Sequence, residues 1–536
     1  MRSLTAPQPI AEPARAGGLL VVAIMLAAVT EAVASTVLSL GRGDIIGDTY
    51  ATPDEFAWLD MGYTAFKLMG FITAPWLITR INPRRLVLLA TITMGMACAL
   101  AAFTANLETL VALRVLQGFV GGVLLISGQT LLFLAYTRSH QPIIQALFAM
   151  GSVVAPATIA PALQGWLLDN ESWTWIFFGN ALIAAMAVGF LLMVEDHAIE
   201  PSPRRPFDWL GFALLSVTLA CLTYICSQGS RWNWFDEPRI IWLASAATIA
   251  FLAFIARQFA VQERGLLDLG VFRTDDFAFA FVVSFVAGAA LFGSAYLIPS
   301  FAVSVLAFTP TDAGQLLLPS GALFVTALLL AAFLMQMRKV PPIATVPFGI
   351  LLIMVGMWML SGSTSQSGSD DMMPAILLRG LGLGFLFLSI QLIAFCALPS
   401  QMLASGIGLF NVGRQLGGLM GVAALQTLID HQIAGNQAVL SAHVTAGSPA
   451  VSERITTMTS VMVGKGMDAA EAGRSALMLL GRAVAGQSTV IAFNSAFAAI
   501  ALLFVVAAPL LIAIKVILSR AGKARRAPIT REGSPA

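Results

Sequence analysis

The chain has 536 residues, of which 58% are hydrophobic and 11% are charged, and its mean hydropathy is +0.84. Values this high are typical of proteins whose surface lies mostly in lipid, because a soluble fold has no use for so much apolar surface. The net charge of +2 is too small to indicate a nucleic-acid partner. We therefore expect an all-α integral membrane protein in contact with a lipid bilayer.

Fourteen apolar stretches are each long enough to cross a bilayer as a helix, which takes about 20 residues. Helix is expected for each of them, since an open strand cannot satisfy its backbone hydrogen bonds in lipid. The expected spans are residues 18–40, 56–78, 86–105, 109–135, 143–168, 174–194, 208–228, 239–256, 276–307, 313–336, 342–361, 373–396, 405–429 and 489–517.

The basic residues indicate which ends of these spans face the cytoplasm, because Lys and Arg concentrate in cytoplasmic loops. If the N-terminus is cytoplasmic, the inner segments hold 18 Lys and Arg residues and the outer segments hold 6. Four of those 6 lie in one long loop, where charge influences topology least. Both termini are therefore expected in the cytoplasm.

The order of the spans predicts two six-helix bundles with a helix pair inserted between them. Short basic turns that contain Pro join spans two and three (80–83) and spans ten and eleven (338–341), at equivalent places in the two halves. Duplicated halves around a midplane site are typical of secondary transporters. The expected divisions are a cytoplasmic tail 1–17, a first bundle 18–194, a cytoplasmic linker 195–207, an inserted helix pair 208–256, a second bundle 276–517 and a cytoplasmic tail 518–536.

A long segment, 430–488, separates the last two spans and is expected as an outer loop. Its stretch 469–484 has the pattern of an amphipathic helix that lies on the membrane surface. A disordered loop is the alternative, because the polarity of the segment is only moderate.

Charged residues inside the apolar spans are the candidate functional groups, because each costs about 2.5–3.5 kcal/mol at the centre of a membrane helix. Counting from the outer ends of the spans predicts that Glu31, Lys67 and Arg114 share one layer of the bundle. Arg379 and Arg414 open or interrupt Gly-rich helices, where anchoring of helix ends and gates is the expected role.

The layer of Glu31, Lys67 and Arg114 has two interpretations. A carboxyl group that alternates between apolar and cation-lined surroundings can bind and release a proton as the protein changes state. Alternatively, the three residues form a static buried cluster that fixes helix packing. If they meet, the cluster is net positive, which favours an amphipathic anion such as an aromatic or fatty acid as the substrate.

From the fourth span onward, the sequence contains motifs of a known family. Arg114-Val-Leu-Gln117-Gly118 is similar to an RxxQG motif, and the stretch from Ala155-Pro156 to Gly165 is similar to an antiporter motif. Further similarity follows at 207–211, 229–235, 296–299, 309–319, 379–382 and 411–418. Over about residues 20–515 the chain resembles the fourteen-span drug:proton antiporters of the major facilitator superfamily, the EmrB/QacA type. This resemblance implies the major facilitator fold, with 14 transmembrane helices arranged 6+2+6.

The chain departs from the family pattern at several positions. The antiporter motif has Ala160 before its second Pro, and Gln164-Gly165 stands where a Gly-Gly pair is usual. The loop after span two lacks its usual Asp, which weakens the case for an Asp-based cytoplasmic gate. Glu31 stands where the first helix of the family usually carries Asp, so the carboxylate is kept.

The resemblance also implies roles for individual residues. The proton-coupling residues would be Glu31 and Arg114, the substrate-cavity residues Gln117, Asn411 and Arg414, and the gating residues of the basic turn and the antiporter motif Arg80, Pro156, Pro161 and Gly165. Lys67 belongs to no motif of the family; its place in the layer of Glu31 makes it a further candidate substrate-cavity residue.

The sequence therefore predicts a proton-driven secondary exporter of amphipathic small molecules in a bacterial inner membrane, with no cofactor and no metal. The resemblance implies that some relatives work with a periplasmic adaptor and an outer-membrane channel. Within transporters, an exporter of a metabolite, a siderophore or a lipid is an alternative. A polytopic membrane enzyme, such as a lipid-modifying transferase, is the alternative of another class; it needs polar catalytic clusters at a membrane face, and the sequence has no HExxH motif and no phosphate loop.

Overall fold

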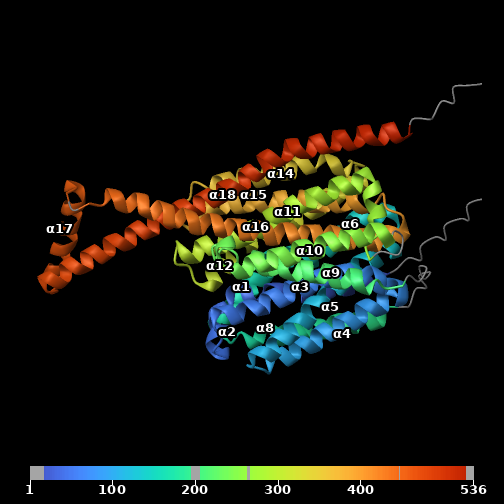
Figure 1. The fold of residues 1–536 in the computed structure, drawn as a ribbon, viewed down its shortest axis with the longest axis horizontal. Helices are drawn as coiled ribbons and strands as arrows, with labels where there is room; N and C mark the ends of the chain where they lie inside the picture. Colours follow the sequence, from blue (N-terminus) through green and yellow to red (C-terminus); the bar gives the residue numbers. More distant parts are fainter. Residues whose placement is uncertain (1–16, 195–205, 262–265, 446, 527–536) are drawn as a thin grey trace, which may run out of the picture.

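The computed structural model describes residues 17–194, 206–261, 266–445 and 447–526, and every regular element in these ranges is helical. The first half of the chain (blue to teal in Figure 1) forms one bundle and the second half (yellow to red) forms another. Helices α9 and α10 lie between them in this view, and α9 packs against both α3 and α16 (Figure 1).

The first bundle consists of the helices expected from the first six apolar stretches. They are α1 (Gly18–Leu40), α3 (Pro53–Arg80), α4 (Pro83–Ala102), α5 (Leu107–Ala135), the consecutive α6 (Gln141–Ala149), η2 (Met150–Ile159) and α7 (Ala160–Asn170), and α8 (Thr174–Met193), with the short α2 (Arg42–Thr49) after α1.

The fifth span is not one regular α-helix. Between α6 and α7 the backbone is π-helical over Met150–Ile159, and Pro156 lies inside this stretch. A proline has no N–H to donate to the preceding turn, so a wider helical pattern at this point is physically reasonable. The fifth span is therefore irregular at the prolines of the antiporter motif, with Pro156 inside the π-helical stretch and Pro161 directly after it.

The second bundle follows the inserted pair α9 (Trp209–Gln228) and α10 (Pro238–Val261). Its helices are α11 (Asp275–Ser304), the short α12 (Pro310–Gln315), α13 (Leu318–Met337), α14 (Val346–Leu360), α15 (Ser369–Phe395), α16 (Ser400–His443), α17 (Pro449–Gly464) and α18 (Ala469–Arg526).

The segment 430–488 differs from the expectation. It is not a loop: α16 continues to His443, α17 follows, and α18 begins at Ala469, so that the segment projects from the bundle as a helical arm with α17 at its tip (Figure 1). Ala472 and Ala476, one turn apart on α18, are fully buried, and α18 packs against α16 and α17. The alanines of this stretch therefore pack against other helices of the arm, whereas Leu477, Met478 and Leu479 are exposed. We call this end of the bundle the arm end.

Twelve helical stretches within the described ranges are long and apolar enough to cross a membrane. The helices α3 and α16 are long enough but are not among them, because polar residues lower their hydropathy, and these include Lys67 on α3 and Arg414 on α16. The count of fourteen spans and the 6+2+6 arrangement stay predictions. The predicted tail 1–17, except Gly17, and most of the linker 195–207 lie outside the described residues, as do residues 527–536 of the C-terminal tail.

Glycines bring α3 and α5 together at backbone distance. A Cβ atom added to Gly118 would lie 2.1 Å from the carbonyl oxygen of Tyr63, and one added to Gly122 would lie 2.4 Å from that of Lys67. Such close approach is typical of membrane helices that pack through small residues. It fixes the backbone of the α3 turn that carries the candidate site.

Candidate functional site

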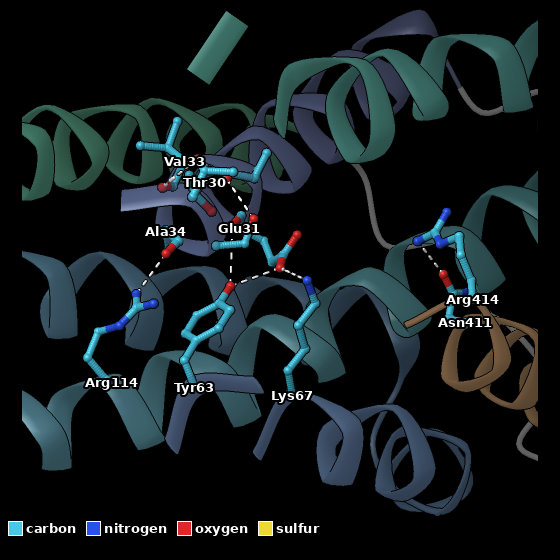
Figure 2. A network of polar contacts seen from close by, with 12 residues as sticks. Thr30, Glu31, Val33, Ala34, Tyr63, Lys67, Arg114, Asn411 and Arg414 are labelled. Carbon is cyan, nitrogen blue, oxygen red and sulfur yellow. Dashed lines mark hydrogen bonds and ion pairs between the residues drawn. The ribbon is translucent and has the colours of Figure 1, made fainter. Parts of the chain in front are cut away.

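Glu31, in the middle of α1, is held by two side chains of α3. Lys67 Nζ lies 2.5 Å from Glu31 Oε1, and the hydroxyl of Tyr63 donates to the same oxygen at 2.9 Å (Figure 2). Glu31 is 1% exposed and Lys67 6%. A buried carboxylate with a cation and a hydroxyl donor is a satisfied ion pair, which can persist in a low-dielectric interior.

Arg114 lies beside this ion pair but does not bind the Glu31 carboxylate. Its Nη1 donates to the carbonyl oxygen of Ala34 at 2.7 Å and to Gln117 Oε1 at 3.1 Å. Its guanidinium carbon lies 4.1 Å from the centre of the Tyr63 ring, close enough for a cation–π interaction. Tyr63 therefore separates Arg114 from Glu31 and touches both. The predicted layer of three charges is present, with a tyrosine at its centre.

Side chains of three other helices bind carbonyl oxygens of α1 around Glu31. These contacts hold the turn that carries the carboxylate in one orientation, since a helix carbonyl can accept a second hydrogen bond. Asn180 of α8 donates to Thr30 at 2.9 Å, Gln164 of α7 donates to Val33 at 3.0 Å, and Arg114 of α5 donates to Ala34 at 2.7 Å.

A second cation faces this cluster from the other bundle. Arg414 of α16 is 6% exposed, and its Nη2 donates to Asn411 Oδ1, one turn earlier, at 2.7 Å. Figure 2 shows Arg414 and Asn411 on the opposite side of Lys67 from Arg114. The Nε of Arg414 is buried and has no hydrogen-bond partner within the described residues.

Arg379 of α15 is buried away from both groups. It is 0% exposed, and its Nε donates to Ser294 of α11 at 2.7 Å. This contact supports the expected structural role, because it ties α15 to α11 inside the second bundle. Across the described spans, Arg114, Arg379 and Arg414 are buried cations that form no ion pair with a carboxylate.

A cavity of about 860 Å³ lies between the bundles toward the arm end. Ser35 of α1 lines it, one turn beyond Glu31, and so does Asp60 of α3, two turns before Lys67. Leu419 and Val422 of α16 line the facing side, beyond Arg414. The ion pair of Glu31 and Lys67 therefore lies below the floor of the cavity, about one helical turn (5.4 Å) from it along α1.

Beyond the ion pair, away from the arm end, the bundles are in contact. A Cβ atom on Gly408 of α16 would lie 2.7 Å from the carbonyl oxygen of Phe71 on α3. The rings of Phe133, Phe395 and Phe410, from α5, α15 and α16, form two edge-to-face contacts with centroids 5.6 and 5.0 Å apart. The backbone contact and the edge-to-face rings close this side of the site, so the cavity of about 860 Å³ lies on the arm-end side.

The predicted gating residues lie apart from the ion pair. Gly165 allows α7 to touch α12, since a Cβ atom there would lie 2.5 Å from the carbonyl oxygen of Pro310. The reverse contact is made by Gly314, next to the carbonyl oxygen of Pro161 at 2.7 Å. Arg80 lies at the other end of α3, over the ring of Trp76 at 5.4 Å. The structure thus places the antiporter motif at a contact between the two bundles.

Two site residues escaped the sequence reasoning. Tyr63 precedes Lys67 by four residues, so the helical period of α3 already places both on one face. Gln164 stands where the family usually has the first glycine of a Gly-Gly pair. Its amide donates to the Val33 carbonyl and to the Thr36 hydroxyl, both at 3.0 Å, on the α1 turn next to Glu31. The signal for both was polarity at helical spacing within an apolar span.

The fold agrees with a comparison against known families. The sequence profile of the Major Facilitator Superfamily matches residues 20–422, which is more than half of the chain. The chain belongs to the major facilitator superfamily.

Curated members of this superfamily match the chain over most of their length. Multidrug export protein EmrB of Escherichia coli K12 is 26% identical over 487 residues, covering 89% of this chain and 91% of the relative. Colistin resistance protein EmrB of Acinetobacter baumannii is 26% identical over 459 residues, with 85% and 88% covered. Fatty acid resistance protein FarB of Neisseria gonorrhoeae is 25% identical over 491 residues, with 90% and 93% covered.

Proposed function

We propose that the chain is a proton-driven exporter of amphipathic small molecules, including drugs. The observation that carries the proposal is the buried ion pair of Glu31 and Lys67 directly below a large cavity between two bundles. Burying ionisable side chains at this depth in a membrane costs free energy, so such residues are rare and usually functional. The names of the similar EmrB proteins, which describe multidrug export and colistin resistance, support the same function.

In this proposal, Glu31 is the proton-binding group. When Glu31 is charged, it holds Lys67 and accepts from Tyr63. When it binds a proton, the ion pair is lost and α1 and α3 are no longer held together by charge. That difference biases the equilibrium between the two orientations of the bundles, which is what a coupled ligand must do.

We propose further that the preferred substrates are amphipathic acids. In Figure 2, Lys67 of the first bundle lies between Glu31 and Arg414 of the second bundle, and each of the two cations keeps 6% of its surface exposed. Glu31 neutralises only one of these cations. A carboxylate bound between Lys67 and Arg414 would contact both bundles, with Asn411 adding a polar group to the lining. Gln117, which the sequence also predicts as a cavity residue, is fully buried and bound to Arg114. A bound carboxylate attracts a proton. Exchange of substrate for proton therefore requires that the two bind to different conformational states of the transporter.

The similarity to a fatty acid resistance protein supports acidic substrates. It does not decide the question alone, because the EmrB relatives are equally similar and their names indicate drugs. A direct comparison of an acid with a cation of similar lipophilicity separates the two cases.

Lys67→Ala is expected to weaken export of acids more than export of cations. Loss of the Lys67 cation removes one of two anchors for a carboxylate, so oleate efflux from everted vesicles should fall about tenfold, which is about 1.4 kcal/mol of binding. Ethidium efflux should fall less, because a cation needs no anchor for a carboxylate and is affected only by the loss of the Glu31–Lys67 ion pair. The measurement is the initial efflux rate of each compound at one imposed pH gradient.

Arg414→Gln provides the second arm of this test, because it removes the facing cation without touching Glu31. The same bias against oleate is expected. If both variants lower oleate and ethidium efflux equally, the proposed preference for acids is wrong, whereas proton-driven export itself is untouched.

We also propose that the arm end faces the periplasm and that both termini are cytoplasmic, in a bacterial inner membrane. Basic residues of the short connections, such as Arg84, Arg138 and Lys339, lie at the opposite end, in agreement with the distribution expected for cytoplasmic loops. A periplasmic adaptor and outer-membrane channel, if the exporter uses them, would meet it at the arm end.

Two native cysteines can report this orientation. Cys226 lines the large cavity, and Cys396 lines a small cavity of about 120 Å³ at the opposite end, together with Arg138. In single-cysteine variants, a membrane-impermeant maleimide should label Cys226 in intact cells and Cys396 only in everted vesicles. Cys98, which is 0% exposed, should react in neither. Labelling of Cys396 from outside would reverse the proposed orientation.

A further inference from the structure

The connection between the inserted helices touches both bundles at the rim of the large cavity. We call this connection, residues 229–237, the strap. It follows directly on Cys226, Ser227 and Gln228 at the end of α9, all three of which line the cavity. The cavity lies where the arm-end halves of α3 and α16 are separated, with Phe56 and Ala57 on one side and Ile429 and Ile433 on the other.

Toward the first bundle, the strap is bound to the beginning of α3. Arg231 Nη1 lies 2.5 Å from Asp54 Oδ1. The helix α9 then follows α3 along its length: the rings of Tyr224 and Trp58 are 5.9 Å apart near the strap, and those of Phe207 and Trp76 are 4.7 Å apart at the far end. These contacts attach the inserted pair to the first bundle.

The inserted pair is itself a unit held together at the end opposite the strap. Asp208, which caps α9, accepts from Arg257 of α10 at 2.6–2.8 Å and from the N–H of Gly211 at 3.0 Å. Burial alone would raise the pKa of Asp208, but the hydrogen bonds from Arg257 and Gly211 outweigh it and hold the pKa below its ordinary value. Asp208 is therefore charged at neutral pH, and its ion pair with Arg257 ties α9 to α10.

Toward the second bundle, the strap makes two side-chain hydrogen bonds to α16. Ser230 donates to Asp430 at 2.6 Å, and the indole N–H of Trp234 donates to Thr427 at 2.9 Å. Asp430 and Thr427 lie at the base of the arm, next to the cavity-lining residues Gln426 and Ile429.

The backbone of the strap is held in an unusual conformation. Asn233 and Trp234 both have positive φ, at 49° and 57°. This region is a genuine outlier for a residue as bulky as tryptophan, and it persists only where surrounding contacts enforce it. Here the N–H of Trp234 donates to the Gly229 carbonyl at 2.7 Å, and the Trp234 ring covers Gly229 so closely that a Cβ atom there would lie 2.8 Å from it. These contacts hold the indole in the orientation in which its N–H reaches the hydroxyl of Thr427.

We infer that the strap is a gate of the large cavity that is fixed to the first bundle and binds α16 of the second bundle reversibly. If the bundles rock to close the cavity, the arm-end halves of α3 and α16 approach each other. The contacts of the strap with Asp54 and α3 can persist through that motion, because both partners belong to one body. The bonds to Thr427 and Asp430 join two bodies, so they must break and re-form in each cycle. The inserted pair then regulates the opening of the cavity.

Two reversible cross-links test this asymmetry in a variant with all four native cysteines replaced by alanine. A short bifunctional methanethiosulfonate reagent would join Ser230→Cys to Asp430→Cys in one protein and Asp54→Cys to Arg231→Cys in the other. The first cross-link should lower efflux of oleate and ethidium about tenfold or more, since it traps one state. The second should leave at least about half of the efflux, since it joins parts of one body. Reductant should restore the first protein.

Continued efflux through the 230–430 cross-link, or an equal loss with the 54–231 cross-link, would overturn the inference. A second measurement needs no substrate. Trp234→Phe removes the hydrogen bond to Thr427, so maleimide labelling of Cys226 as the only cysteine should slow by about twofold or more. Trp232→Phe makes the same chemical change in a strap residue that contacts Arg231, and it should label at the parental rate. Equal labelling of both variants would also contradict the gate.

Discussion

Glu31→Gln should abolish proton-coupled efflux while leaving a correctly inserted protein. Glutamine matches glutamate in shape, and its amide oxygen can still accept from Tyr63 and Lys67, so the packing of α1 on α3 is kept. It cannot bind and release a proton at accessible pH. Because a transporter that binds no proton cannot use a proton gradient, pH-driven efflux from everted vesicles should fall to the level of vesicles without the protein.

The matched control is Glu108→Gln in the first turn of α5, because Glu108 is exposed and lies outside the site. It should transport at the parental rate. Exchange of preloaded substrate without an imposed pH gradient should persist in Glu31→Gln, since the substrate pathway is intact. Normal pH-driven efflux from Glu31→Gln would remove Glu31 from the mechanism, and a protein that fails to insert would show that the static role of the ion pair dominates.

The helical architecture could be predicted from apolar length because a bilayer leaves the backbone few other choices. The two helices α3 and α16, which carry Lys67 and Arg414, show this apolar pattern least clearly. Lys67 on α3 and Asn411 with Arg414 on α16 lower the hydropathy of their helices, so that neither is among the apolar candidate spans. Both helices were still predicted, as the apolar stretches 56–78 and 405–429, because each stretch is apolar apart from a few polar residues.

The arm shows the limit of the hydropathy pattern. The stretch 469–484 is amphipathic, and a sequence does not say whether an apolar face meets lipid or another helix. In the structure, Ala472 and Ala476 face protein, and the helix runs without interruption into the last span. Small residues such as alanine favour close contact between helices. The alanines of this stretch could therefore have predicted that it packs against another helix.

The site itself was predicted in part. Depth counting placed Glu31 and Lys67 at one level, and their atoms meet at 2.5 Å. It could not show that Arg114 turns toward the carbonyl of Ala34 instead of the carboxylate, because the rotamer depends on the neighbouring ring of Tyr63. It also could not show that Gln164 and Asn180 converge on the same turn of α1, since they lie more than 130 residues along the chain from it.

Gly118→Val should damage both the stability of the first bundle and the site. A Cβ atom at Gly118 would lie 2.1 Å from the carbonyl oxygen of Tyr63 and 2.8 Å from its carbonyl carbon, and both are backbone atoms that cannot rotate away. The helices α3 and α5 must separate to admit the new side chain. Overpacking costs about 1–3 kcal/mol even where side chains can adjust, so the apparent melting temperature in detergent should fall by about 5–10 °C.

Gly189→Val on α8 is the control, because nothing lies within 4 Å of a Cβ atom there and the residue is exposed. It should melt like the parent. The separation in Gly118→Val also moves Tyr63 and Lys67 away from α1, so efflux should be lost even from the fraction that stays folded. A Gly118→Val protein that melts and transports like Gly189→Val would mean that α3 and α5 are not in backbone contact. The ion pair would then need another explanation, because this contact is what brings the Lys67 backbone within reach of Glu31.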